Sequence, residues 1–242
     1  MAQLALWLTL GYLSGSLPTA YLVAKYLRGI DIRDYGSGNA GGANIYTHVA
    51  PWAALLVGLI DAIKAAAPTL LALCLAGSQG IAAAAGIGAV IGHCWSLYLD
   101  FTGGRGMAPT LGALLLLFPQ GAAYIIVLHL LGSAARLAAA ADFVALATLP
   151  LLALVLLGNA PPVWMGLAIF LVVAAKRLHA NRLPLPQDPA QRRAVLRRRL
   201  IYDRDVPRGQ PWAEREAGIR SRESADKGQK IEEGTTSSPP AP

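Results

Sequence analysis

Charged residues are scarce in this sequence, and cysteine is nearly absent. Lys, Arg, Asp and Glu together make up 14% of the 242 residues, 55% are hydrophobic, and the mean hydropathy is +0.45. So few polar side chains do not cover the surface of a water-soluble globule, which excludes that class of protein. The two cysteines, Cys74 and Cys94, lie singly in apolar runs. This excludes a disulfide framework and a cysteine-rich metal site.

The N-terminus also lacks the features of a removed signal peptide. No Lys or Arg precedes the first apolar segment, and no small-residue cleavage site leads into a soluble domain. We therefore expect the first helix to be retained in the membrane.

Long apolar runs predict an all-α, polytopic integral membrane protein with about seven transmembrane helices. A membrane-spanning helix needs about 20 predominantly apolar residues. The long run 107–137 is interrupted at Phe118-Pro119-Gln120-Gly121, a helix stop and restart, so it predicts two helices, the first of them short. The other expected spans are residues 3–26, 51–76, 81–101, 138–157 and 163–175.

The positions of the cations predict the orientation. Lys and Arg flanking spans are retained on the cytoplasmic side. The even-numbered connections, at 77–80, 119–120 and 158–162, carry no Lys or Arg, which predicts the N-terminus outside and the C-terminus inside. The odd-numbered connections carry Lys25, Arg28, Arg33, Arg105, Arg136, Lys176, Arg177 and Arg182.

The C-terminal part is polar, so we divide the chain into a membrane-embedded domain, 1–183, and a basic juxtamembrane segment with a tail, 184–242. Residues 190–200 contain five arginines: Arg192, Arg193, Arg197, Arg198 and Arg199. They form either a basic helix on anionic headgroups or a solvated cluster that sets topology. Beyond Asp205 the Arg, Glu, Ser, Gly and Pro composition predicts disorder.

Two glycine-rich connections fall on the predicted cytoplasmic face. Residues 36–44 read Gly-Ser-Gly-Asn-Ala-Gly-Gly-Ala-Asn, and residues 101–110 contain three glycines around Arg105. Glycine allows the left-handed conformations in which successive N–H groups point into one concavity that suits an anion, although such a segment also makes a plain tight loop. We favour a phosphate site, in which Arg105 clamps an oxyanion. Its candidate binding residues are Ser37, Gly38, Asn39, Gly41, Asn44, Gly103, Gly104 and Gly106.

Three polar residues lie inside the apolar runs. Asp61 and Lys64 are three positions apart and share a helix face, as an ion pair that is either structural or functional. His93 follows Gly92 in the third run, and a lone helix histidine is more often a packing group than a catalyst. We assign all three a supporting role.

These segments together resemble one family, the bacterial acyl-phosphate:glycerol-3-phosphate acyltransferases. The resemblance covers about residues 10–183 and is specific in the first two loops. The matching segments are Gly11-Tyr12-Leu13-Ser14-Gly15-Ser16-Leu17-Pro18, Gly29-Ile30-Asp31-Ile32-Arg33, Gly36-Ser37-Gly38-Asn39, Asp61 to Lys64, Gly92-His93 and Gly103-Gly104-Arg105-Gly106.

The resemblance implies a seven-helix enzyme of the bacterial plasma (inner) membrane. It implies transfer of a fatty acyl group from acyl phosphate to the 1-hydroxyl of glycerol 3-phosphate, giving lysophosphatidic acid for phospholipid synthesis, at a site that faces the cytoplasm. It implies no metal, no acyl-CoA and no other cofactor; the lipid bilayer is the expected partner, with no nucleic acid. The implied catalytic residues are His179, Asn181 and Arg105.

The sequence departs from the family pattern at several positions. The family has Thr at Ala43, Arg near Thr47, and Lys at both Thr102 and Arg105, so one cation of three remains. Alanines at 138–141 replace a serine pattern, and His179 and Asn181 are two residues apart instead of three. These differences leave open an enzyme with another polyol or phosphorylated acceptor, or a non-catalytic relative that binds lipid or acyl phosphate. A transporter is disfavoured because internal repeats and matching broken helices are absent.

Overall fold

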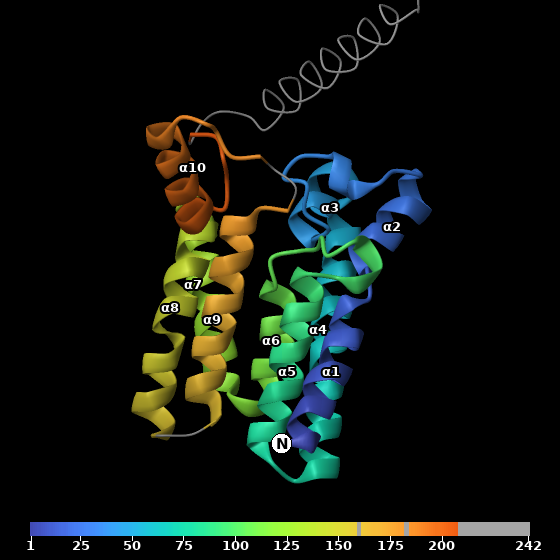
Figure 1. Cartoon of the computed structure of the whole chain (residues 1–242), viewed down its shortest axis with the longest axis vertical. Coiled ribbons are helices and arrows are strands. Elements are labelled where there is room, and N and C mark those ends of the chain that lie inside the picture. The colour runs from blue at the N-terminus through green and yellow to red at the C-terminus, as the bar shows by residue number, and fades with distance from the viewer. Residues whose placement is uncertain (159–160, 182–183, 208–242) are drawn as a thin grey trace, which may run out of the picture. The chain divides into compact units, whose positions relative to one another are not determined.

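The computed structural model describes residues 1–158, 161–181 and 184–207, and these contain helices and no strand. The chain divides into a compact unit, Met1–Asp205, and a second unit, Val206–Pro242, most of which lies outside the described residues. The predicted disorder beyond Asp205 concerns that second unit. The elements of the first unit, drawn in Figure 1, are α1 (Ala2–Ser16), α2 (Thr19–Arg28), η1 (Ile32–Asp34), α3 (Gly42–His48), α4 (Pro51–Ala76), α5 (Gln79–Cys94), η2 (Leu97–Leu99), α6 (Met107–Leu117), α7 (Pro119–Ala134), α8 (Ala138–Leu157), α9 (Pro161–His179) and α10 (Pro189–Tyr202).

Three helices, α4, α8 and α9, are long and apolar enough to cross a membrane, and α5 and α6 are shorter apolar helices. Their outward side chains remain uncovered by protein: Leu55, Leu75 and Val155 are 78%, 75% and 73% exposed. An apolar surface of this kind is stable against lipid tails and not against water. The described helices are therefore those of an integral membrane protein.

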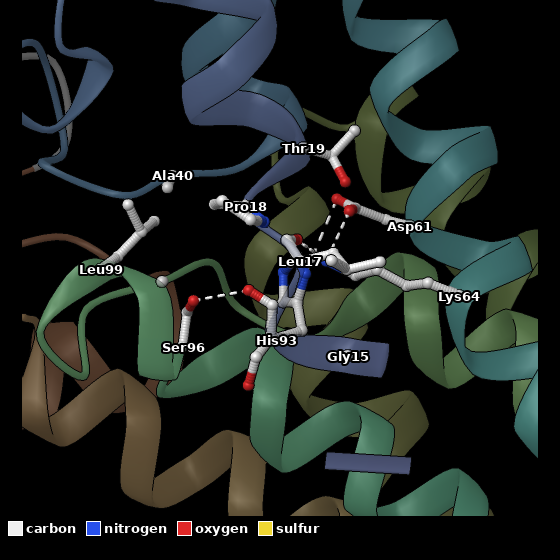
Figure 2. Close-up of a pocket in the computed structure, with 12 residues that line it drawn as sticks. Gly15, Leu17, Pro18, Thr19, Ala40, Asp61, Lys64, His93, Ser96 and Leu99 are labelled. Atoms are coloured by element: carbon white, nitrogen blue, oxygen red, sulfur yellow. Dashed lines mark hydrogen bonds and ion pairs between the residues drawn. The ribbon is translucent and has the colours of Figure 1, made fainter. Parts of the chain in front are cut away.

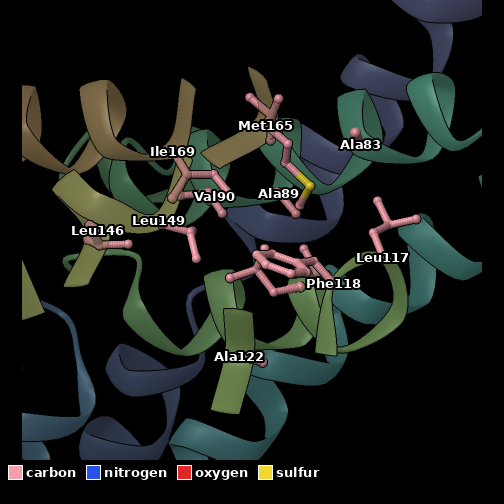
Figure 3. Close-up of a cluster of buried hydrophobic side chains, with 14 of the residues drawn as sticks. Ala83, Ala89, Val90, Leu117, Phe118, Ala122, Leu146, Leu149, Met165 and Ile169 are labelled. Carbon is pink, nitrogen blue, oxygen red and sulfur yellow. The ribbon is translucent and has the colours of Figure 1, made fainter. Parts of the chain in front are cut away.

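The sequence predicts α4 and α8 with their observed bounds, and it also predicts the division of the fourth run. Pro119 opens α7 directly after α6, at a position where the missing N–H is harmless. Phe118, at this corner, is fully buried, and Figure 3 shows it next to Ala122 with Leu149 and Met165 close by. The corner is thus part of the apolar core between α5 and α9.

Other predicted helix bounds were wrong. The single helix expected over 3–26 is two helices, α1 and α2, separated by Leu17 and Pro18. The helix expected over 81–101 ends at Cys94, where the chain turns into η2, and the last span is longer than predicted. Pro18 lacks the N–H that would continue α1, and polar contacts described below take over the freed carbonyls.

Helices α1 and α5 pack with almost no side chain between them. A Cβ atom on Gly15 would overlap the backbone of Ala89, and one on Gly92 would overlap that of Tyr12. In a membrane, small residues let helix backbones approach closely and gain dispersion contacts. This contact fixes the C-terminal ends of α1 and α5 against each other.

The polar connections gather at one end of the compact unit. Figure 1 shows α2, α3 and α10 at that end, with the N-terminus and the α4–α5 turn at the other. Helix α10 packs against α8 and α9 and belongs to the same compact unit. The basic segment at 190–200 is indeed helical, but its Arg199 is buried rather than solvated.

Candidate functional site

Asn181 lies where the two glycine-rich loops meet. Its Nδ2 donates to the carbonyl oxygens of Gly38, at 2.9 Å, and Gly103, at 3.2 Å. Its Oδ1 accepts from Lys176 Nζ at 2.6 Å and from the Gly103 N–H at 3.4 Å. One amide side chain therefore joins both loops to the end of α9, which brings together three segments that the sequence predicted to form one site.

The chain after α9 turns sharply to place Asn181 there. Ala180 and Asn181 have φ values of +44° and +50°, the left-handed region that residues with a Cβ seldom adopt. His179, the other residue of this predicted catalytic pair, is exposed, and its ring lies against Trp95 with centroids 6.4 Å apart. The structure does not bring the His179 ring into the hydrogen-bonded group around Asn181.

The first loop, 36–44, is held from inside by Asn44. The buried Asn44 Nδ2 donates to the carbonyl oxygens of Ile32, Tyr35 and Asn39 at 3.0, 2.8 and 3.2 Å. This side chain shapes the loop instead of facing a ligand. Two N–H groups of the loop are also bonded locally, that of Gly38 to the Tyr35 carbonyl and that of Gly41 to the Asn39 carbonyl, so only part of the predicted anion cradle is available.

The left-handed backbone predicted for this loop is present. Gly36 and Gly38 have φ values of +53° and +69°. Gly41 brings the loop against the second one, since a Cβ on it would lie 3.7 Å from the Cα of Gly104.

The second loop is packed tightly against the end of α5. The Gly104 N–H donates to the carbonyl oxygen of His93 at 3.1 Å, and a Cβ on Gly104 would overlap the His93 ring. Gly106 has a φ of +80° and precedes the first turn of α6. Both positions therefore require glycine, one for space and one for backbone conformation.

Arg105 carries the cation of the second loop, and its guanidinium is held on several sides. Nη1 donates to the carbonyl oxygen of Lys176 at 2.8 Å, and Nε lies 2.7 Å from Asp203 Oδ1. The Asn39 amide either accepts from Asn181 Nδ2 at 2.7 Å or, with its oxygen and nitrogen exchanged, accepts from Arg105 Nε and from Ser37 Oγ, both at 3.1 Å. The sequence-predicted Ser37, Asn39 and Arg105 thus lie together.

Lys176 and Asp203 belong to this site and were missed from the sequence. The Lys176 side chain is fully buried, with its ammonium 5.2 Å from the centre of the Trp95 ring. We had assigned Lys176 to topology alone, although its place five residues before Asn181 was a usable signal. Asp203 follows α10 in a polar segment, and no motif marks it.

The predicted supporting residues Asp61, Lys64 and His93 form a buried cluster beside the break between α1 and α2, as Figure 2 shows. Asp61 lies 2.9 Å from Lys64 Nζ and 3.7 Å from His93 Nδ1. Lys64 Nζ also donates to the carbonyl oxygen of Leu17 at 2.8 Å, and Ser14 Oγ donates to that of Lys64 at 2.7 Å. The cluster therefore stabilises the open end of α1.

A small pocket of about 10 Å³ lies between this cluster and the loops. Its lining combines residues of the α1–α2 break with Ala40 of the first loop, Gly103 of the second, and the Asp61, Lys64 and His93 side chains. Asp61, Lys64 and His93 thus share one pocket with both glycine-rich loops.

Arg33 brings a further cation to the second loop. Its Nη1 lies 3.3 Å from both Thr102 Oγ1 and the carbonyl oxygen of Leu99. Asp31 pairs with it at 2.7 Å, and the side-chain hydrogen bond from Arg33 holds the pKa of Asp31 below its ordinary value. Arg33 therefore places positive charge at Thr102, where the resembling family has Lys. Thr47 is exposed, and its hydroxyl donates to the Ala43 carbonyl.

The residues that the structure describes contain no group of three or more His, Cys, Asp or Glu side chains placed to hold a metal ion. The groups at the site that suit an anion are instead the Lys176 ammonium, the Arg105 guanidinium, amide side chains and backbone N–H groups. Such groups bind and orient anions.

Comparison with known proteins places the chain in a family. The family model described as glycerol-3-phosphate acyltransferase matches residues 5–183. Glycerol-3-phosphate acyltransferase 1 of Dehalococcoides mccartyi is 36% identical over 207 residues, which cover 78% of this chain and 94% of the relative. The glycerol-3-phosphate acyltransferase of Parasynechococcus marenigrum is 38% identical over 186 residues, covering 76% and 88%.

A solved structure has the same fold. The crystal structure of PlsY (YgiH), an integral membrane glycerol 3-phosphate acyltransferase, in its glycerol 3-phosphate form superimposes with a TM-score of 0.69. The match covers 85% of this chain and 96% of PlsY at 24% identity. From the matched residues and the two relatives, this chain belongs to the glycerol-3-phosphate acyltransferase family.

Proposed function

We propose that the protein transfers a fatty acyl group from acyl phosphate to the 1-hydroxyl of glycerol 3-phosphate, releasing lysophosphatidic acid and inorganic phosphate. The observation that carries the proposal is the Asn181 side chain, which joins both glycine-rich loops and Lys176 into one cationic site. Two relatives with long matches carry the name glycerol-3-phosphate acyltransferase. The proposed reaction uses neither acyl-CoA nor a metal ion.

Acyl phosphate is a mixed anhydride with a good leaving group, so the enzyme mainly has to bring two phosphate groups together and aim a hydroxyl at the carbonyl. The glycerol oxygen forms a bond to the acyl carbon, the bond from that carbon to the phosphate oxygen breaks, and phosphate leaves. The hydroxyl proton passes to a phosphate oxygen. Arg105 and Lys176 supply the positive charge that binds the phosphates and stabilises the leaving group.

Proton removal does not require His179 in this scheme. The His179 ring lies on Trp95 and outside the group around Asn181, whereas a substrate phosphate oxygen is present in every complex. A direct transfer also fits the sequence, which shows no Ser-His-Asp arrangement for an acyl-enzyme intermediate.

We also propose seven membrane crossings, by α1, α4, α5, α6, α7, α8 and α9, in the bacterial inner membrane. The N-terminus lies outside, and the site faces the cytoplasm. Supporting this, Lys25 lies in α2, Arg33 lies in η1, and Lys176 lies in the last turn of α9, which precedes α10. Figure 1 shows α2, α3 and α10 at the same end of the body. The α4–α5 turn at the opposite end carries no Lys or Arg, as expected for an outer connection.

One observation favours an alternative function, in which the acyl group passes to an acceptor other than glycerol 3-phosphate. Thr47 is exposed and places no cation where the family has Arg, so the site has less charge with which to bind a second phosphate. A polyol, or another phosphorylated acceptor, would then replace glycerol 3-phosphate in the same chemistry.

The test uses the full chain in detergent or vesicles with palmitoyl phosphate and a wide range of glycerol 3-phosphate concentrations, with lysophosphatidic acid and phosphate measured. The wide range is needed because losing a contact that binds substrate and transition state equally raises KM and leaves kcat unchanged. We expect acyl transfer without acyl-CoA or added metal. Transfer only to another acceptor would support the alternative, and acyl phosphate left intact would indicate a non-catalytic relative.

The variant Arg105→Ala, measured in the same assay, tests whether Arg105 contributes to the reaction. Removal of a charge-assisted bond to phosphate should lower kcat/KM by at least about 30-fold, which corresponds to about 2 kcal/mol. Arg136→Asn is the control, because Arg136 is an exposed cation in another connection, between α7 and α8, and Asn tolerates its φ of +57°. Activity of Arg105→Ala near that of Arg136→Asn would remove Arg105 from the site.

A further inference from the structure

The chain beyond the family match folds back onto the site. The matched residues end at 183, whereas α10 spans Pro189–Tyr202. The buried Arg177 at the end of α9 joins α10 to α8: its Nη1 donates to the Leu200 carbonyl oxygen at 3.0 Å and to that of Ala139 at 2.9 Å. The C-terminal end of α10 is therefore bound to the membrane body by a cation that satisfies its last carbonyls.

A second buried arginine fixes the turn that follows α10. Arg199 binds both carboxylate oxygens of Asp205, each at 2.8 Å, and donates to the carbonyl oxygen of Leu178 at 3.2 Å. Such a two-pronged contact sets orientation as well as distance. The turn between Arg199 and Asp205 is thus held against the end of α9.

Asp203 occupies the middle of that turn and reaches the site. Its backbone has a φ of +50° and caps α10, and its Oδ1 lies 2.7 Å from Arg105 Nε. The two side chains are only 21% and 12% exposed, so solvent screens the pair weakly. Arg105 also donates to the Lys176 carbonyl, next to Arg177, so one end of α9 holds both α10 and Arg105.

We propose that Asp203 is a positioning residue for the reaction: it pairs with Nε of Arg105 and so orients the whole guanidinium. Nε and Nη2 then lie 3.1 and 3.3 Å from the Asn39 amide, and Nη2 faces a bound phosphate. An arginine has five N–H donors in a rigid fork, so two fixed positions determine where the rest point. The segment after residue 183 is then a part of the active site rather than a tail. This inference rests on the proposed function.

Asp203→Asn tests the proposal, because it keeps the shape of the side chain and removes its charge. We expect KM for one of the two phosphate substrates, acyl phosphate or glycerol 3-phosphate, to rise by about tenfold, with kcat changed by less than about twofold. Measuring both KM values identifies the phosphate that Arg105 binds. Asp203→Glu should restore much of the loss. In an Arg105→Ala background, Asp203→Asn should have no further effect, because the two residues act as one unit.

Asp188→Asn is the matched control. Asp188 caps the start of α10 by accepting from the Gln191 N–H at 2.7 Å, and Asn caps equally well. The control removes one negative charge from the same segment, away from Arg105. If Asp203→Asn behaves like Asp188→Asn in an active protein, the inference is wrong while the proposed function stands.

Two further outcomes would also overturn the inference. A lower KM in Asp203→Asn would mean that the carboxylate competes with phosphate for Arg105. If the parent protein transfers no acyl group at all, titration calorimetry with glycerol 3-phosphate and with inorganic phosphate replaces KM. Equal dissociation constants for the parent and Asp203→Asn, or no binding by the parent, would then contradict the assignment of Asp203.

Discussion

Asn181 illustrates how one side chain decides the geometry of a site built from loops. Glycine-rich loops have many accessible conformations, and each hydrogen bond to a fixed amide removes some of them. Asn181 supplies both a donor and an acceptor, and it contacts Gly38, Gly103 and Lys176. The loops are therefore held in position by a side chain in the turn that follows α9.

Asn181→Ala should disrupt the site more than any other single change in its loops. The substitution leaves the buried Lys176 ammonium without its 2.6 Å acceptor and frees both loops. A buried polar group left unsatisfied costs about 1–3 kcal/mol, and more when it is charged. We expect a lower unfolding temperature in detergent and a loss of acyl transfer of about 100-fold or more, both measured on the purified variant.

His179→Ala is the comparison for this prediction. Since the His179 ring contacts Trp95 and lies outside the Asn181 group, its removal should reduce activity by a much smaller factor. A loss as large as that of Asn181→Ala would show that a histidine base is required after all.

At the residue scale the sequence predicted what short patterns encode. The glycine loops, the Asp61 and Lys64 pair and the role of Arg105 as the loop cation are visible as residue types at fixed spacings. The partnership of Arg105 with Asp203 is not visible, because the two residues are far apart in the chain and only the docking of α10 brings them together. The buried position of Lys176 was hidden for a related reason, since a cation at the end of a span equally fits a role in topology.

At the scale of elements, the break after α1 shows a limit of hydropathy. Residues 3–26 are apolar enough for one helix. The hydropathy pattern contains no information on the hydrogen bonds between Lys64 of α4 and the end of α1, which lie at the break. The Lys64 ammonium satisfies the Leu17 carbonyl, which lies outside both helices at the break. Helices that end at ordinary signals, such as α4 between Pro51 and Gly77, were predicted with their observed bounds.

Gly15→Leu should destabilise the protein through the contact of α1 with α5. The added Cβ would overlap the backbone of Ala89, and backbone does not move aside as a flexible side chain does. We expect a loss of about 2 kcal/mol or more, measured as a lower unfolding temperature in detergent.

Gly58→Leu is the control for this prediction. It adds the same side chain to a helix in which a new Cβ meets no atom of the described residues within 4 Å. Equal unfolding temperatures for the two variants would contradict the proposed close packing of α1 and α5.

At the scale of the whole molecule, the distribution of charge predicts which end of the body faces the cytoplasm. All Lys and Arg of the predicted connections fall in the odd-numbered ones, and one outward-facing connection with cations would break the pattern. Composition alone gave the membrane class and the all-helical fold. Composition did not predict that α10 packs against the membrane body, because a polar composition is compatible both with a solvated tail and with a helix that folds back.

Reporter fusions test the orientation of the molecule. A phosphatase that is active only outside the cytoplasm should be active when fused at Gly77 and inactive when fused at Asp188. A second fusion at Gly158 is the control, because that position lies in another cation-free connection and should behave like Gly77. Phosphatase activity at Asp188, or its absence at Gly77, would show that the orientation is inverted.

The contact between α1 and α5 also has a consequence for how the protein is made. Ser96 Oγ bonds the Ser16 carbonyl oxygen across 80 positions of sequence, and the glycine face of α1 fits the backbone of α5. At a synthesis rate of about 5–20 residues per second, α1 leaves the ribosome roughly 4–16 s before this partner exists. During that interval the glycine face of this 15-residue helix has no α5 to pack against. The period before α5 is made is therefore a vulnerable stage of biogenesis, and we expect a pause in translation before α5 to lower the yield of folded protein.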